Sequence, residues 1–155
     1  MQSEEGYGLP ERNEIVSYRT FDASREALYS MFEQPEHLIH WWGPKGFTNT
    51  FYEFDLRPGG IWRFEMQGPD GTRYELHKRF VAIAKPDCIV FDHIQPTHGF
   101  RMTMRFSVDG AGSRLEWRMV FESAEECDSV RDIIRSANEE NFERLADYLK
   151  TAQTS

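Results

Sequence analysis

Short connections between strand-like segments constrain the fold of this chain more than any other feature of its sequence. Aromatic and β-branched residues gather in six runs, 47–56, 61–67, 72–84, 88–95, 100–108 and 114–122. Turn-forming residues fill the connectors between them, 58–60, 68–71, 85–87, 96–99 and 109–112. A parallel crossover needs about a dozen residues, so connectors this short predict antiparallel neighbours.

The residues before these runs predict a further strand and two short helices. Residues 1–12 are acidic and contain glycine, and we expect a flexible tail there. The run 13–22 has a strand pattern, and Ser24 can cap a helix over 25–33. Pro35 suits the first turn of a second short helix.

A long amphipathic helix is predicted at the C-terminal end. Ser123 and Glu126 form a capping box, and apolar residues keep to one face as far as Leu149. At a rise of about 1.5 Å per residue such a helix spans about 40 Å, enough to cross a sheet. A curved antiparallel sheet of about seven strands, wrapped around the helix, buries its apolar stripe. We therefore predict an α+β fold, with a single domain over residues 13–150.

Charge and hydropathy narrow the partners of the chain. The formal net charge is −8 at pH 7, and lysine and arginine form no cluster that can follow phosphates, which argues against nucleic acid. No apolar run approaches the roughly 20 residues of a membrane span, and the start lacks signal-peptide character, so we expect a cytoplasmic location. Cys88 and Cys127 fit buried apolar positions better than a disulfide or a metal site.

Alternation along the strands predicts one apolar face of the sheet. The residues placed on it are Trp62, Phe64, Met66, Met102, Met104, Phe106, Leu115, Trp117, Met119 and Phe121. Charged residues such as Arg105 and Glu116 fall on the other face, where we expect solvated cross-strand pairs. Aromatic residues make up 14% of the chain, which favours a cavity lined by rings and thioethers between sheet and helix. The alternative is that the rings pack solidly and leave no void.

A few polar side chains interrupt the predicted apolar surfaces. His93 continues a period-two apolar pattern, so it points inward unless a bulge reverses it. It is either a core histidine with a satisfied hydrogen bond or a group that orients a ligand or moves a proton. Asn141 lies in the middle of the apolar face of the long helix and Asn138 at its edge, and a buried amide needs protein, water or ligand as a partner. Tyr74 faces inward if its strand has no bulge.

The histidines and cysteines lack the spacing of a metal site. His37 and His40 can meet on one face of a short helix, but no third or fourth ligand with suitable spacing accompanies them. No catalytic triad pattern, phosphate loop or nucleotide fingerprint is present either. We therefore predict no metal and no cofactor.

Several segments resemble a known family. They are R-T-F-D-A-S-R-E (19–26), P-E-H-L-I-H-W-W-G-P-K-G-F (35–47), D-L-R-P-G-G-I-W-R-F (55–64), G-P-D-G (68–71) and L-A-D-Y-L (145–149). Together they are similar to the bacterial homologues of the heat-shock chaperone ATPase activator, within the START-like, polyketide-cyclase-related (SRPBCC) superfamily. The resemblance covers nearly all of the chain after the tail and implies the helix-grip fold with a deep hydrophobic cavity. Ala137 and Asn138 stand where relatives often carry Gly-Trp, and His93 where they are often aromatic, which implies a more polar cavity.

Three functions remain open at this point. The first is binding of a small hydrophobic or aromatic molecule in the cavity. The second is a cyclase- or hydratase-like reaction on a polyketide-like or aromatic substrate, and the third is stimulation of a chaperone ATPase. A homodimer is also left open. The candidate ligand-binding residues are Trp42, Phe64, Met66, Tyr74, His93, Met102, Met104, Trp117, Asn138 and Asn141.

Overall fold

A curved antiparallel sheet forms most of the structure. The computed structural model describes residues 12–95 and 99–154, and within these ranges seven strands pair in the order β1-β7-β6-β5-β4-β3-β2. The strands are β1 (Glu14–Phe21), β2 (Thr48–Phe54), β3 (Ile61–Gln67), β4 (Arg73–Ala84), β5 (Cys88–Gln95), β6 (Phe100–Asp109) and β7 (Gly112–Phe121). Each neighbouring pair is antiparallel, as the short connectors predicted. The predicted tail and the connector 96–99 fall largely outside the described residues.

The three helices begin where their caps predicted. Helix α1 (Arg25–Glu33) is capped by Ser24, whose Oγ accepts a hydrogen bond from the Ala27 N–H at 3.0 Å. Helix α2 (Pro35–Trp41) starts at its proline. Helix α3 (Ala124–Thr154) follows Ser123, whose Oγ accepts from the Glu126 N–H at 3.1 Å. This last helix runs past the predicted end at Leu149, because no glycine or proline follows to stop it.

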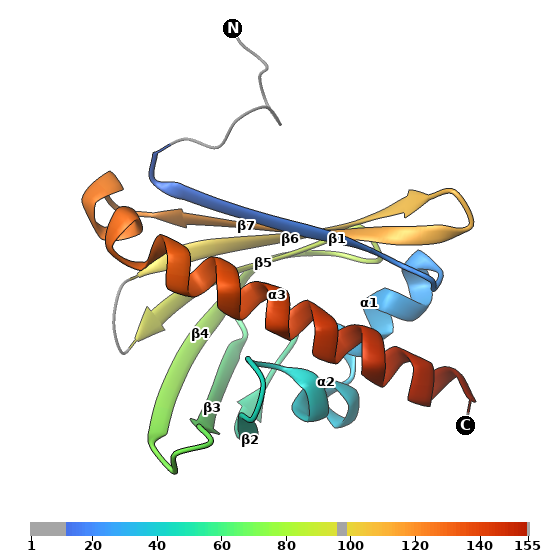
Figure 1. The fold of residues 1–155 in the computed structure, drawn as a ribbon, viewed down its shortest axis with the longest axis horizontal. Helices are drawn as coiled ribbons and strands as arrows, with labels where there is room; N and C mark the ends of the chain where they lie inside the picture. The colour runs from blue at the N-terminus through green and yellow to red at the C-terminus, as the bar shows by residue number, and fades with distance from the viewer. Residues whose placement is uncertain (1–11, 96–98, 155) are drawn as a thin grey trace, which may run out of the picture.

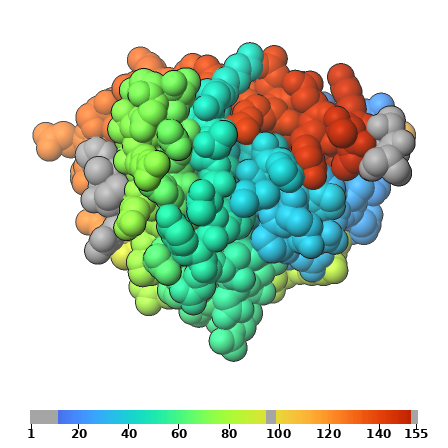
Figure 2. All heavy atoms as spheres, turned by 90° about the horizontal axis from the view of Figure 1, so that it is seen from below, coloured from blue at the N-terminus to red at the C-terminus, as the bar shows by residue number. Residues whose placement is uncertain are grey.

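The sheet curves around α3 but is not covered evenly by it. Helix α3 lies across the concave face and packs on β1 and β7, as Figure 1 shows. Helix α2 packs on β2 and also touches α3, so it covers the opposite end of the sheet. Seen from below in Figure 2, α2 and the β2–β3 region form the surface between α1 and β4. The part of the concave face that β4 and β5 form therefore lies between α3 and α2.

Aromatic side chains fill the centre of the concave face. Trp62, Phe64, Met104 and Trp117 are each at most 2% exposed, which confirms the predicted alternation. Trp62 stacks on Phe64 at 4.5 Å between ring centroids. On the side toward α3, Trp117 meets Phe142 edge-on at 4.6 Å. Rings thus join β7 to the long helix, and the Met104 side chain brings β6 into the same core.

Candidate functional site

The W-W-G-P segment is fastened to α3 by two side chains of that helix. Asn141 accepts a hydrogen bond from the Gly43 N–H at 3.1 Å and donates one to the Trp41 carbonyl at 2.9 Å. Arg144 donates to the carbonyls of Trp42, Gly43 and Pro44 at 3.3, 3.1 and 2.9 Å. These contacts fix the turn that follows α2 and hold Trp41 and Trp42 beneath the helix.

Glycine is required at position 43 by its backbone conformation. Its φ of +102° lies in the left-handed region, which disfavours any side chain. A Cβ there would also displace the flexible end of the Met66 side chain, whose methyl carbon would lie 2.5 Å away. The tight turn thus lets β3 approach the W-W-G-P segment.

The buried amides of α3 have protein partners. Asn141 uses both its oxygen and its nitrogen on backbone groups, and Asn138 donates to Ser17 Oγ at 3.2 Å. Of the partners that the sequence left open for Asn141, which were protein, water or ligand, the backbone of the W-W-G-P segment supplies both bonds. Contact of Asn138 or Asn141 with a ligand stays a prediction.

Rings occupy the interior under the middle of α3. Trp42 lies 5.0 Å from Trp62 and 5.4 Å from Trp117, measured between ring centroids. The void between Trp62, Phe80, Met104 and their neighbours has a volume of about 10 Å³, room for no more than one water. At this place the rings pack solidly and leave no ligand-sized cavity, which was the alternative to the cavity predicted from the sequence.

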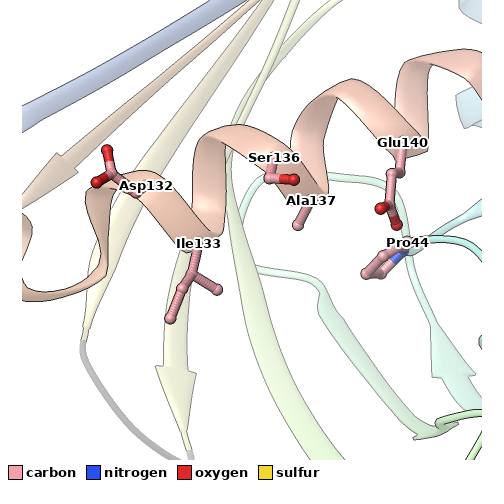
Figure 3. A pocket seen from close by; sticks show the side chains of 6 residues that line it. All are labelled: Pro44, Asp132, Ile133, Ser136, Ala137 and Glu140. Carbon is pink, nitrogen blue, oxygen red and sulfur yellow. The ribbon is translucent and has the colours of Figure 1, made fainter.

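A ligand-sized groove runs along α3. It has a volume of about 450 Å³ and is lined by Pro44, Asp132, Ile133, Ser136, Ala137 and Glu140. Figure 3 shows Ile133 and Ala137 on the side of α3 that faces the groove, with the Glu140 carboxylate beside Pro44. Ile133 is 73% exposed, although an isoleucine of this helix would normally be buried. The groove therefore presents apolar surface to solvent.

Lys78 and His93 form a buried polar pair on the concave face. They are cross-strand partners on β4 and β5, and Lys78 Nζ lies 3.1 Å from His93 Nδ1. Lys78 is 4% exposed and His93 7% exposed. Among the described residues no carboxylate forms an ion pair with Lys78. An amine buried in this way is costly unless other groups stabilise it.

Aromatic rings surround the amine. Lys78 Nζ lies 4.7 Å from the ring centroid of Phe91, 5.4 Å from that of Phe100 and 5.9 Å from that of Trp62. His93 stacks on Phe100 at 4.9 Å. The ring faces attract the ammonium form, yet they supply no hydrogen-bond acceptor comparable to a carboxylate.

Burial dominates the protonation of this pair. Desolvation lowers the pKa of Lys78 from 10.5 to about 7. Desolvation, and then the charge of Lys78, lowers the pKa of His93 to about 3. At neutral pH the imidazole is therefore neutral, and a large share of the amine is unprotonated. Strongly shifted groups in a cleft are characteristic of functional sites.

Exposure rises along β4 from the amine toward the sheet end. Lys78 is buried, Leu76 is half-buried and Tyr74 is 43% exposed, and all three share the inward face of the strand. A second hollow, of about 570 Å³, reaches His93 from the ends of β5, β6 and β7, where Gly99, Phe100 and Glu122 also line it. The pair thus lies just inside the surface of the molecule.

Two indole groups add buried donors to the same face. Within the described part of the chain, the Nε1–H groups of Trp62 and Trp117 have no hydrogen-bond partner. Buried donors of this kind usually bind a water or a ligand atom. The concave face therefore offers hydrogen bonds as well as apolar surface.

Comparison with known proteins places the chain in a family. The family model described as "Activator of Hsp90 ATPase homolog 1-like protein" matches residues 22–150. The chain belongs to this family. No curated protein matches the sequence.

Solved structures of proteins from several bacteria share the fold. A protein from Nitrosomonas europaea superposes with a TM-score of 0.86 at 15% identity, covering 95% of this chain and 100% of its own. One from Arthrobacter aurescens gives 0.83 at 24% identity, covering 90% and 87%. An AHSA1 protein from Silicibacter pomeroyi gives 0.75 at 18% identity, covering 90% and 99%. The resemblance and the helix-grip fold predicted from sequence are confirmed.

The predicted site residues come from three parts of the fold. Phe64, Met66, Met102, Met104 and Trp117 are buried on the strands, and His93 points inward as the alternation predicted. Trp42 follows α2, and Asn138 and Asn141 lie on α3. Tyr74 lies at the exposed end of the inward face of β4. Lys78 was missed, although it shares the parity of the apolar residues Leu76 and Phe80 in β4. Its place on the same face of β4 as Leu76 and Phe80 was the sequence signal that could have identified it as inward-facing.

The remaining candidate ligands for a metal have other contacts. His37 Nδ1 lies 2.8 Å from the Tyr148 hydroxyl, and His40 stacks on the same ring. Cys88 and Cys127 are free thiols. Within residues 12–95 and 99–154 no group of three histidine, cysteine or acidic side chains is arranged to hold a metal ion. None of the helices there is long and apolar enough to cross a membrane.

Proposed function

We propose that this chain binds a small apolar or aromatic molecule in the groove that α3 forms beside Pro44. Membership of the AHSA1 family supports a ligand-binding or an activator-type role in general. A cyclase- or hydratase-like reaction and stimulation of a chaperone ATPase remain the alternatives. A cytoplasmic location and a homodimer stay predictions.

The observation that carries this proposal is the exposed apolar surface of α3 over the groove. Helix α3 rests on β1 and β7, and it turns Ile133 and Ala137 toward a hollow of about 450 Å³. Pockets for small ligands commonly have volumes of about 300–1,000 Å³ and are lined mainly by apolar groups with a few polar ones. Asp132, Ser136 and Glu140 supply the polar groups, which make up half of the six lining residues.

Partly buried rings elsewhere in the molecule add accessible apolar surface. Phe100 and Phe47 are only partly buried, and Phe100 lines the second hollow. Aromatic rings bind other rings through edge-to-face and offset contacts, which add to the free energy of burial.

The test uses N-phenyl-1-naphthylamine, a neutral aromatic probe whose fluorescence rises in apolar surroundings. We expect saturable binding to the wild-type chain. Ile133→Arg places a charge in the groove and should weaken binding by about tenfold or more, equivalent to about 1.4 kcal/mol. Ile133 is largely exposed, so this change should leave the fold intact.

Val108→Arg is the matched control. Val108 is 66% exposed and lies on β6, close to the β6–β7 turn, outside the residues that line the groove. This variant should bind the probe like the wild type. Equal affinity of Ile133→Arg and the wild type, or the absence of saturable binding to the wild type, would overturn the proposed function.

A further inference from the structure

We propose that Lys78 is a nucleophilic amine that forms an imine with an aldehyde or ketone ligand. This inference rests on the proposed function: we take the carbonyl compound to enter by way of the groove along α3, although Lys78 is not itself among the residues that line that groove. It extends that function by naming the ligand class and the atom that bonds to it.

The surroundings of Lys78 differ from those of the other lysines. The chain has four lysines, at positions 45, 78, 85 and 150. Lys45 and Lys85 are exposed and pair with Glu143 and Glu33. Lys150 is exposed on α3. Lys78 alone of the four is buried, and its hydrogen-bond partner is a neutral imidazole.

Structural roles account poorly for an amine in this position. A lysine that serves stability usually extends to the surface or pairs with a carboxylate, and Lys78 does neither among the described residues. A leucine or methionine would fill the same apolar space between Phe91, Phe100 and Trp62 without the cost of burying an amine. The amine is thus explained more readily by its chemistry than by packing.

The protonation state favours nucleophilic attack. Burial lowers the pKa of Lys78 to about 7, so about half of the amine carries a free lone pair at neutral pH. A lysine desolvated in an apolar pocket is one of the established ways to activate this nucleophile. The hydrogen bond to His93 Nδ1 holds one side of Nζ and leaves its other sides toward the rings.

The proposed step is a condensation without oxidation or reduction. The Nζ lone pair attacks the carbonyl carbon, a C–N bond forms, and the π electrons of the C=O bond move to oxygen. Nitrogen then loses two protons, and the carbonyl oxygen leaves with two protons as water when the C–O bond breaks. The products are the imine and one water, and the reverse reaction releases the carbonyl compound.

The experiment traps this imine in the wild-type chain. The protein is incubated at pH 7 with a limiting amount of 2-naphthaldehyde and sodium cyanoborohydride, which reduces the imine to a stable secondary amine. Peptide mass spectrometry then gives the rate of labelling at each lysine and at the N-terminal amine. We expect Lys78 to be labelled at least about tenfold faster than Lys45, Lys85 or Lys150.

Competition with N-phenyl-1-naphthylamine connects the label to the groove. Excess probe should slow labelling of Lys78 and leave labelling of Lys85 unchanged. If the probe binds but Lys78 is labelled no faster than the exposed lysines, the inference is wrong while the proposed function stands. Labelling of Lys78 that the bound probe does not slow would also overturn it. Absence of probe binding would refute the proposed function itself.

Discussion

Replacing Lys78 by methionine should change how the stability of the protein depends on pH. Methionine has a similar length and suits the apolar surroundings of Phe91, Phe100 and Trp62. The wild type pays a free-energy cost for any charge on the buried amine, whereas the variant has no amine at this position. The difference between the two chains therefore isolates the titration of one group.

The sign follows from the two pKa values of Lys78. The pKa is about 7 in the folded chain and 10.5 when the group is unperturbed. Between these values the unfolded chain binds the additional proton, so the free energy of unfolding of the wild type rises with pH. The slope approaches about 1.4 kcal/mol per pH unit. Below about pH 7 both states are protonated, and the cost of the buried charge is fully present.

Between pH 7.5 and 9.5 the titration of His93 and Tyr29 does not affect the difference in stability between the two chains. His93 has a folded pKa of about 3, so it is neutral throughout this range in the wild type. Tyr29 has a pKa raised by burial to about 12, and it is present in both chains. Over these two pH units, the free energy of unfolding of the wild type should rise by about 2–3 kcal/mol relative to Lys78→Met.

The measurement is urea denaturation followed by tryptophan fluorescence at pH 7.5, 8.5 and 9.5 and constant ionic strength. Lys85→Met is the control, because Lys85 is an exposed lysine paired with Glu33, and its difference from the wild type should be almost independent of pH. The reasoning would be refuted if the difference in free energy of unfolding between the wild type and Lys78→Met changed by less than about 0.5 kcal/mol from pH 7.5 to 9.5. A change that small is comparable to the error of extrapolating to zero urea.

Two further predictions concern the buried amide and the absence of a metal requirement. Asn141→Leu should lower the free energy of unfolding, measured by chemical denaturation, by about 2–4 kcal/mol. The change leaves the Gly43 N–H and the Trp41 carbonyl unpaired, at a cost of about 1–3 kcal/mol each. Unchanged stability would contradict this and show that water replaces both bonds. Treatment with EDTA should leave the melting temperature unchanged, and a fall of many degrees that zinc reverses would contradict this.

Much of the fold could be predicted because its signals are local. Turn residues close each strand, and Ser24, Pro35 and Ser123 mark the starts of the three helices. The observed strand boundaries lie within about two residues of the predicted ones, as expected when turn chemistry decides them. The end of α3 was placed too early because the apolar stripe fades before the helix does, and no residue after Leu149 breaks it.

The packing of the site depends on contacts that the sequence does not record. Alternation correctly assigned the rings to the concave face, but it gives no distance between rings on different strands. Trp42 follows α2 and enters the core between Trp62 and Trp117, so it fills space that strand parity alone leaves open. The accessible volumes lie instead along α3 beside Ile133 and Ala137, and at the ends of β5, β6 and β7 beside His93.

The two polar groups of the site show why sequence reasoning selected one and missed the other. Asn141 interrupts an apolar helical stripe, which is easy to see, yet its partners come from a turn about 100 residues away that no pattern connects to it. Lys78 lies between His77 and Arg79, and three basic residues in a row suggest a solvated strand.

Strand register decides the position of Lys78. It lies opposite His93, next to an irregularity in the β4–β5 pairing. A bulge changes which residues face inward, so parity alone could not establish its burial.

The residue that is easier to notice in the sequence, Asn141, is the one whose burial costs less free energy. A buried amide with two backbone partners costs little, whereas a buried amine without a carboxylate costs several kcal/mol when charged. The less conspicuous residue is therefore the stronger indication of function.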